Sequence, residues 1–579
     1  MKLFGLKTAA TLFCIACVGL FSACEQERAP PQEQANEPPA RQLYFGGDIL
    51  TMQGEEPAYV EALVVDADKI TFAGDLSEAE KKFPNAQTVD LGGKTLLPGL
   101  IDGHAHFSAF GVQAIGAQIL PPPDAGANDI PTLINILREW STPENRALTG
   151  WIFGMGFDDS VLEEKRFPTK HDLDKVSREF PVMIVHISGH FAVVNSKGLE
   201  KLGYDTNTQD PEGGLIRREN GNEPNGVLEE LAAIPHLITA IAPASRQAAD
   251  RFFEAGQTMA LSYGYTTAQD GRTMESAHQQ MVDAANSGQL KLDVVSYVDY
   301  TAVDELMASE WNSKQYSNHY RIGGMKVTLD GSPQGRTAWR TIPYLLPPDG
   351  ADANYKGYPA IPNDETLRAI YEKAYKNNWQ VLTHANGDAA ADQLLRTLRS
   401  LEKDYSHAQR RDVIIHGQYL REDQLDDAKD LNLMVSLFPL HTYYWGDWHK
   451  QIIGERLGNK ISPTRTALDK GVKITIHTDA PVALPNLMRM MGISVERKSR
   501  SGRVIGANEK ITAYEALQAI TRWSAYQHFE EDTKGTLEAG KLADLVILDK
   551  NPLKVPEEDI KNIVVLETIK EGRTVYTKQ

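Results

Sequence analysis

Cysteine is nearly absent from this chain. Only three cysteines occur among 579 residues, and all of them, Cys14, Cys17 and Cys24, lie close to the N-terminus. The rest of the chain therefore has no disulfide and no thiolate to offer a metal. Any metal site in the folded part must be built from His, Asp, Glu or Lys.

The chain also lacks an excess of positive charge. Its net charge is −18, whereas nucleic-acid-binding proteins carry basic patches, so we exclude nucleic acid as a partner. The apolar content of 41% is that of an ordinary soluble domain and excludes a polytopic membrane protein. An apolar stretch from Ala9 to Phe21 is shorter than the ~20 residues that span a bilayer comfortably.

The N-terminus has the features of a targeting segment. Lys2 and Lys7 precede the apolar stretch, and Ser22-Ala23-Cys24 follows it, which is the order of a secretory signal. The Cys after Ser-Ala resembles the lipobox of bacterial lipoproteins. This implies a signal peptide over 1–23, lipidation of Cys24, and anchoring at the periplasmic side of the outer membrane. The alternative is a plain secretory signal with an incidental Cys. Residues 24–40, rich in Pro, Gln and Glu, predict a flexible tether.

Two segments at opposite ends of the remaining chain share one pattern. Residues 41–95 and 530–579 both contain short β-type runs separated by turns. We expect them to form one composite small β-domain, a β-sandwich, with the large domain inserted between them. Two separate β edges on the large domain are the alternative.

Between these segments, residues 96–529 alternate apolar strands with helical periodicity, for example Leu394, Leu395, Leu398 and Leu401. This alternation predicts an α/β fold with a parallel sheet, and eight strands predict a (β/α)8 TIM-like barrel. The expected strands are 96–101, 266–268, 292–298, 325–329, 380–383, 413–415, 433–437 and 473–476. The count requires an insertion at about 112–260, which would shape the substrate pocket.

Polar residues stand at the ends of five of these strands, where the strands of a barrel converge on one mouth. They are His104, His106, Lys326, His384, His416 and Asp479. Each alone is unremarkable, because a single strand-end His or Asp is more often structural. Two histidines at i and i+2 of a strand point the same way and form a metal-binding pair. Packing is a poor explanation for the six residues together.

Several motifs in the chain resemble the amidohydrolase superfamily, in particular its amidohydrolase-3, or YtcJ-like, branch. They are 97–106 (LPGLIDGHAH), 326–338 (KVTLDGSPQGRTA), 383–388 (THANGD), 415–418 (IHGQ), 477–482 (HTDAPV) and 535–548 (GTLEAGKLADLVIL). The chain departs from the branch at Ile415, where Glu is frequent, and at His477, where a small residue is common. Both changes keep the expected ligands.

The resemblance implies a metal centre with one or two divalent ions, zinc in first place. His104 and His106 would hold the more buried metal, and His384 and His416 the outer one. Lys326, carboxylated by CO₂, would bridge them, and Asp479 would bind metal and relay protons as the catalytic residue. The alternative for the lysine is an ammonium that binds substrate beside a single metal.

Three residues outside the metal set are candidates for binding substrate. His190, in Ser188-Gly189-His190, resembles a substrate-side position of the family but is equally explained as part of the insertion's packing. Gln334 and Arg336 follow the Lys326 strand and could contact substrate, although Arg336 also suits a surface ion pair. The aromatic cluster at 441–445 favours an apolar substrate group, or ordinary loop packing.

The sequence thus predicts a metal-dependent hydrolase that cleaves a non-peptide carbon–nitrogen bond of a small molecule with metal-activated hydroxide. Three alternatives remain: a mononuclear deaminase, an esterase or lactonase on the same barrel, and a surface binding lipoprotein without catalysis. A monomer and a homodimer are both open.

Overall fold

The computed structural model describes residues 40–211, 214–306, 308–348 and 350–579. The predicted signal peptide, Cys24 and nearly all of the tether lie outside these residues, so lipidation and localisation stay predictions. Within the described ranges, no helix is both long and apolar enough to cross a membrane.

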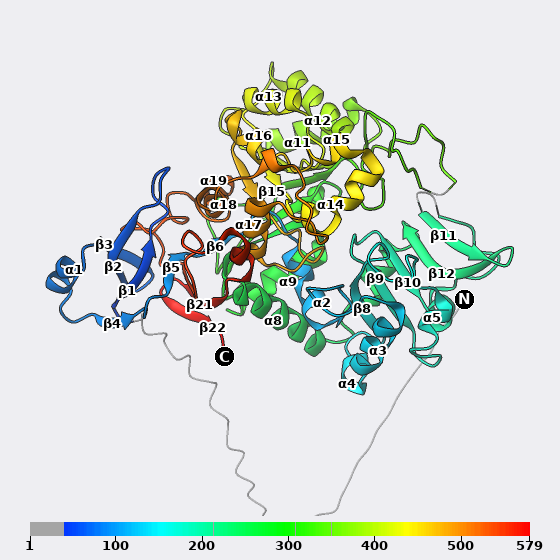
Figure 1. Cartoon of the computed structure of the whole chain (residues 1–579), viewed down its shortest axis with the longest axis horizontal. Coiled ribbons are helices and arrows are strands. Elements are labelled where there is room, and N and C mark those ends of the chain that lie inside the picture. Colours follow the sequence, from blue (N-terminus) through cyan, green and yellow to red (C-terminus); the bar gives the residue numbers. More distant parts are fainter. Residues whose placement is uncertain (1–39, 212–213, 307, 349) are drawn as a thin grey trace, which may run out of the picture. The chain divides into compact units, whose positions relative to one another are not determined.

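Eight parallel strands form the central sheet, and their spatial order follows the chain. Two of them, β6 and β15, are labelled in Figure 1. Most of their residues are buried, as in a parallel sheet covered by helices. The strands are β6 (Leu100–Ile101), β13 (Tyr265–Thr273), β14 (Asp293–Asp299), β15 (Tyr320–Thr328), β16 (Gln380–Ala385), β17 (Val413–His416), β18 (Met434–Leu437) and β19 (Ile474–Ile476).

Helices connect successive strands of this sheet. The clearest are α8 (Arg246–Ser262), α9 (Glu275–Asn286), α11 (Asp364–Lys376), α12 (Asp388–Leu401), α13 (Glu422–Asp430) and α16 (Thr464–Asp469). In α12 all four leucines of the predicted apolar face are buried. The predicted α/β class with helices between parallel strands is confirmed.

The central sheet curls so that its first and last strands approach each other beyond their C-terminal ends. The backbone N–H of His106 donates to the carbonyl of Ala480 at 2.9 Å, and that of Asp479 to the carbonyl of His104 at 3.3 Å. Among the described strands, no ladder joins β6 to β19. The curl brings the residues that follow the strands to one place.

The predicted first strand, 96–101, is divided between two sheets. Residues Thr95–Pro98 form β5, which pairs with β20 (Leu545–Leu548), whereas β6 pairs with β13. Pro98 has no N–H to continue a ladder, and the N–H of Gly99 donates to the backbone carbonyl of Asp544 at 2.8 Å. A Cβ at Gly99 would lie 2.2 Å from Oγ1 of Thr266, so only glycine allows this close crossing.

Strands from both ends of the described chain form a second sheet, in the order β22-β21-β20-β5-β1-β2-β3, with β4 beside β1. The other members are β1 (Gln42–Leu50), β2 (Tyr59–Asp66), β3 (Lys69–Gly74), β4 (Gln87–Asp90), β21 (Val565–Lys570) and β22 (Arg573–Thr577). The two predicted segments therefore share one sheet, while the second layer of a sandwich stays a prediction.

A third sheet lies between β6 and β13 in the chain, within the range expected for the insertion. Its order is β11-β12-β10-β9-β8-β7. The strands are β7 (Ala117–Gln118), β8 (Ile152–Phe157), β9 (Val182–His186), β10 (Phe191–Val194), β11 (Gly214–Glu219) and β12 (Glu223–Glu230). Helix α3 (Ile130–Trp140) buries its apolar face in a core that this sheet also lines.

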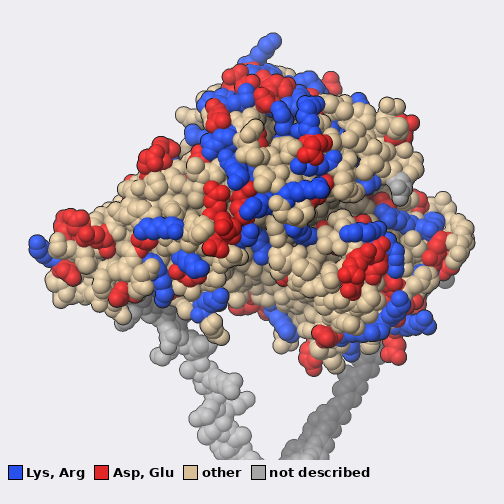
Figure 2. Space-filling view, in the orientation of Figure 1, with Lys and Arg blue, Asp and Glu red and all other residues tan. Residues whose placement is uncertain are grey.

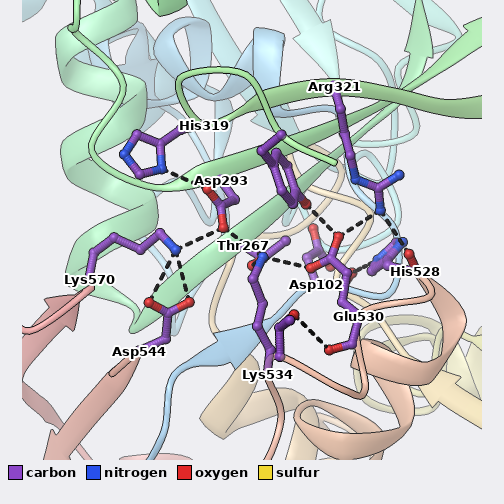
Figure 3. A network of polar contacts seen from close by, with 12 residues as sticks. Asp102, Thr267, Asp293, His319, Arg321, His528, Glu530, Lys534, Asp544 and Lys570 are labelled. Atoms are coloured by element: carbon purple, nitrogen blue, oxygen red, sulfur yellow. Dashed lines mark hydrogen bonds and ion pairs between the residues drawn. The ribbon is translucent and has the colours of Figure 1, made fainter. Parts of the chain in front are cut away.

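Buried charges connect the central sheet to the sheet of the chain ends (Figure 3). Asp293, the first residue of β14, accepts from Lys534 at 2.6 Å and from Lys570 of β21 at 2.8 Å. Lys570 also donates to Asp544 at 2.9 Å, and Lys534 to Glu530 at 2.6 Å. Because each charge has an opposite partner, burial is tolerated.

Candidate metal centre

The structure brings together all six strand-end residues predicted from the sequence. His104 and His106 follow β6, Lys326 lies in β15, His384 in β16 and His416 at the end of β17, and Asp479 follows β19. These elements are far apart in the chain and adjacent only in the curled sheet.

The distances within the cluster are short. His104 Nε2 lies 2.8 Å from Lys326 Nζ and 3.5 Å from Asp479 Oδ1. His106 Nε2 lies 3.3 Å from Asp479 Oδ1, and His416 Nε2 lies 3.9 Å from Asp479 Oδ2. The carboxylate of Asp479 is thus at the centre of three imidazoles.

His104 and His106 reach the cluster from a turn, not from the strand end that the sequence analysis expected. Strand β6 stops at Ile101, and the N–H of His104 donates to Oδ1 of Asp102 at 3.2 Å. The two rings still lie 5.2 Å apart, centroid to centroid. The closeness of the His104 and His106 rings is therefore determined by this turn and by its contacts with the segment after β19.

The buried histidines of the cluster favour the neutral form. Burial and the neighbouring Lys326 hold the pKa of His104 well below its usual range. Burial and Lys326 also lower the pKa of His384 to about 3. For His416, burial and the nearby His384 lower the pKa strongly. Neutral imidazoles keep the lone pairs that a metal needs.

The lysine and the aspartate have shifted pKa values as well. Burial lowers the pKa of Lys326 to about 7, so a large fraction of its amine is neutral near physiological pH. Burial alone would raise the pKa of Asp479, but the hydrogen bond and charge of His106 outweigh it and lower the pKa. Asp479 is therefore ionised at neutral pH.

Residues that the sequence analysis did not single out orient the imidazoles. Gln269 of β13 donates through Nε2 to the carbonyl of Gly103 at 2.9 Å, which leaves its Oε1 to accept from His104 Nδ1 at 2.6 Å. The proton of His104 is thereby held on Nδ1, and Nε2 faces the cluster with its lone pair.

A similar arrangement stands behind His416. Its Nδ1 lies 3.1 Å from Nε2 of His477, and Nδ1 of His477 lies 2.9 Å from Oγ of Ser436. If both Nδ1 atoms carry protons, His416 donates to His477 and His477 to Ser436. His416 Nε2 is then free, 3.1 Å from Nδ1 of His384. The sequence signal was the unusual histidine at 477 in the HTDAPV motif.

Asp330 holds the loops after β15 and β16 against each other. Its carboxylate accepts from the backbone N–H groups of Asn386 at 3.0 Å and Gly387 at 2.7 Å. Burial raises the pKa of Asp330 to about 7 despite these bonds. Its Oδ1 lies 3.5 Å from His384 Nε2, so it also supports that ring.

The predicted substrate-side residues have different surroundings. His190 Nδ1 lies 2.8 Å from Oε2 of Glu230; burial alone would lower the pKa of His190, but Glu230 raises it. The charge of Asp479 adds a smaller contribution that also raises the pKa of His190. Gln334 has a buried Oε1 without a hydrogen-bond partner. Arg336 stacks on Trp448 and donates to Pro347, which suits packing as well as binding.

The donor set fits a divalent metal. His104, His416 and Asp479 offer ligand atoms that all lie within 4.8 Å of one another, and the buried Oδ1 of Asp479 lies 3.3 Å from His106 Nε2 and 3.5 Å from His104 Nε2. Neutral imidazole nitrogens and a carboxylate oxygen are the ligands that zinc and related metals take in catalytic sites.

Comparisons with known proteins agree with this geometry. The profile described as "Amidohydrolase family" matches residues 87–576, most of the chain. The chain belongs to the amidohydrolase family. It is a hydrolase acting on carbon–nitrogen bonds, as the sequence analysis predicted.

Two curated relatives span nearly the whole of this amidohydrolase. "Putative amidohydrolase YtcJ" of Bacillus subtilis is 26% identical over 551 residues, covering 93% of this chain and 99% of that one. "N-substituted formamide deformylase" of Arthrobacter pascens is 25% identical over 535 residues, covering 90% and 95%. Neither likeness fixes the substrate.

Solved structures resemble this amidohydrolase over a similar length. An uncharacterised metal-dependent hydrolase from Pyrococcus horikoshii superposes with a TM-score of 0.71 at 25% identity, covering 90% of this chain and 99% of that one. A counterpart from Pyrococcus furiosus gives a TM-score of 0.69 at 25% identity, covering 89% and 100%. Together with the ligand cluster, these likenesses support a divalent metal.

Proposed function

We propose that this amidohydrolase cleaves small N-substituted amides, formamides among them, at a zinc centre in the mouth of a closed (β/α)8 barrel. One observation carries the proposal: four histidines, Lys326 and Asp479 converge from distant elements onto one buried cluster. The deformylase named among the relatives supports N-substituted amides as the substrate class.

The residues of the cluster support the following assignment of metal ligands. His104, His106 and Asp479 would hold one ion, and His384 and His416 a second, with carboxylated Lys326 between them. When bound, such a metal supplies Lewis acidity that lowers the pKa of water and polarises a carbonyl group. Without that help an amide is too stable toward water at neutral pH.

Lys326 has the properties that carboxylation requires. Its amine is buried and its pKa is lowered to about 7, so the nucleophilic neutral form is available. The amine nitrogen attacks the carbon of CO₂, a C–N bond forms, and one proton leaves to solvent. The product is an anion, which replaces a repelled ammonium beside cations.

The chain's own groups then handle the substrate and its protons. Asp479, ionised at neutral pH, accepts the proton of the attacking water and passes it to the departing nitrogen. His190, paired with Glu230, presents an N–H to the substrate carbonyl oxygen. The buried setting of the cluster excludes bulk water from the reacting groups.

A substrate screen with the metal-loaded protein tests this function. N-benzylformamide, N-benzylacetamide and benzylurea are offered, and release of benzylamine is measured, alongside ester hydrolysis and release of ammonia from aminated heterocycles. We expect benzylamine release that a chelator abolishes and Zn²⁺ restores. Ammonia release without amide cleavage would establish the deaminase, and ester cleavage alone the esterase. Metal binding without any turnover would favour the binding lipoprotein.

A further inference from the structure

A cavity lies outside the metal cluster. Its volume is about 280 Å³, the size of a small organic molecule, and none of the six cluster residues lines it. Its walls come from the loop after β15, the N-terminal turn of α13, and α15 (Glu455–Gly458). Figure 2 shows basic and acidic side chains interspersed over the part of the surface where Figure 1 places α13.

The acidic groups of this wall already have partners. Glu422 pairs with Lys460 at 2.8 Å, and Asp388 with Arg421 at 3.3 Å. Glu509 accepts from the backbone N–H of Thr466 at 3.0 Å. Glu422 and Asp388 therefore each have a cationic partner in the wall, and Glu509 has a backbone donor.

Two cations of the wall, Arg340 and Arg456, have no carboxylate within ion-pair distance among the described residues. Arg340 is decisive because it is only 4% exposed. Its guanidinium lies 4.8 Å from the ring centroid of Tyr344 and 5.6 Å from that of Tyr419. Its Nη1 donates to the carbonyl of Pro343 at 3.2 Å. A guanidinium has five N–H donors, so the others are left for a bound anion.

The remaining wall is apolar. Leu420, Leu425 and Ile453 are buried there, and Ile342 lies at the rim with 51% of its surface exposed. A cavity with uncompensated arginines and aliphatic walls complements an anion that carries a hydrocarbon part. A carboxylate suits the planar fork of arginine, and the aliphatic side chains would cover the hydrocarbon.

We propose that this cavity is an accessory binding site for a small organic carboxylate with an apolar body. The site is separate from the metal centre but adjoins it through the chain. Tyr419 comes three residues after His416, and Asp388 four residues after His384. The hydroxyl of Tyr419 is also hydrogen-bonded to His449 Nδ1 at 2.8 Å, and His449 Nε2 to His441 Nδ1 at 3.0 Å.

Isothermal titration calorimetry of the metal-loaded, full-length protein with hexanoate tests the site. A metal-stripped sample, which lacks the other place where a carboxylate would bind, should bind hexanoate with the same affinity. We expect one hexanoate per chain, with no binding of hexan-1-ol, which lacks the charge, or of inorganic phosphate, which lacks the apolar part. Absence of hexanoate binding, or equal binding of hexanol, would overturn the proposal.

Variants locate the binding. Arg340→Met is expected to weaken hexanoate at least about tenfold, the value of a charge-assisted hydrogen bond. If Arg340→Met does not fold, two substitutions outside the buried interior replace it. Arg456→Ala and Ile342→Asp, at the rim, are each expected to weaken hexanoate binding several-fold. Arg503→Ala, an exposed arginine outside the cavity wall, is the matched control. Binding that no wall variant weakens would place the carboxylate elsewhere.

Discussion

At the scale of single residues, the hydrogen-bond partners of the cluster histidines are as important for metal binding as the imidazoles themselves. A histidine can offer either ring nitrogen, and the partner of the other nitrogen decides which one is free. Gln269 makes this choice for His104, and His477 for His416. These partners are buried and contribute no ligand atom themselves, so their effect should appear in metal affinity.

The first prediction concerns His477. His477→Phe keeps a ring of similar size but removes the acceptor of the His416 Nδ1 proton, so His416 can turn or change tautomer. We expect metal affinity to fall about 10–100-fold, measured by competition with a chromogenic chelator, while circular dichroism stays unchanged. His278→Phe, a buried histidine bonded to Tyr320 away from the cluster, is the control. Equal metal affinity in both variants would contradict the role of His477.

The second prediction concerns Asp479. Asp479→Asn keeps the shape of the side chain but removes its charge and its ability to accept a proton. We expect kcat for the amide substrate to fall by about 10²–10⁴, the usual share of general acid–base catalysis, with little change in Tm. Asp447→Asn, a partly exposed aspartate that accepts from Ser499, controls for loss of an acidic side chain. Turnover near that of the wild type would exclude Asp479 as the proton acceptor.

The third prediction concerns Lys326 and pH. Because the pKa of Lys326 is lowered to about 7, protonation below that pH removes the amine that reacts with CO₂. Metal content, measured by mass spectrometry after equilibration with bicarbonate, should therefore fall as pH drops from about 8 to about 6. Lys326→Ala should lose roughly half of the metal, with partial rescue of activity by propionate. One metal per chain, unchanged by the substitution, would rule out the bridge.

At the scale of elements, the sequence predicted strands best where the chain is continuously apolar. Residues 413–415 and 433–437 are examples, since strands buried on both faces need no polar alternation. Strand β15 begins at Tyr320, earlier than the predicted 325, because Arg321 and the glycines after it conceal the strand. Arg321 is buried there with an ion pair to Glu530, 209 residues away in the chain, and a hydrogen bond to the carbonyl of His528.

Prediction of the metal-site residues from the sequence had the same limit, because contacts between distant elements are not visible in it. Strand-end polar residues such as His384 and Lys326 could be found from the sequence, because the ends of parallel strands meet. Gln269 and Asp330 could not, since their importance comes from contacts with other elements. The predicted end of the first strand at residue 101 agrees with the structure, but the sequence did not show that the apolar run 96–101 serves two sheets in succession.

The fourth prediction concerns Gly271 of β13, whose missing side chain leaves space for the His104 imidazole. A Cβ at Gly271 would lie 2.1 Å from Cε1 and 2.5 Å from Nδ1 of His104. Gly271→Ala should displace the imidazole, lower metal content and activity, and cost about 1–3 kcal/mol of stability by overpacking. Gly126→Ala, which meets no atom within 4 Å, is the control. Full metal content in Gly271→Ala would show that the ring is not held in this position.

At the scale of the whole described chain, the central sheet and the sheet of the chain ends are connected by compensated buried charge. Glu530 accepts from Lys534 at 2.6 Å and from Arg321 at 2.6 Å, and Lys534 reaches Asp293 of β14 (Figure 3). Removal of one member leaves its partners buried without compensation, which costs more than loss of an exposed pair.

The fifth prediction follows from that asymmetry. Glu530→Gln should lower the free energy of unfolding at pH 7 by about 3–5 kcal/mol, measured by urea denaturation. Glu531→Gln, which breaks a partly exposed pair with Arg411, should cost at most about 1 kcal/mol.

The dependence on pH sharpens the test of Glu530. Burial alone would raise the pKa of Glu530, but Lys534 and Arg321 outweigh burial and lower it to about 2 from the ordinary 4.5. A carboxyl with a lowered pKa in the folded state contributes stability that is complete above the unfolded pKa and is lost as pH falls toward the folded one. The stability difference between wild type and Glu530→Gln should therefore be constant from pH 7 to about pH 5 and shrink as pH falls from 4.5 toward 2. A difference that stays constant through this acidic range would mean that Glu530 is not held ionised by its two cationic partners.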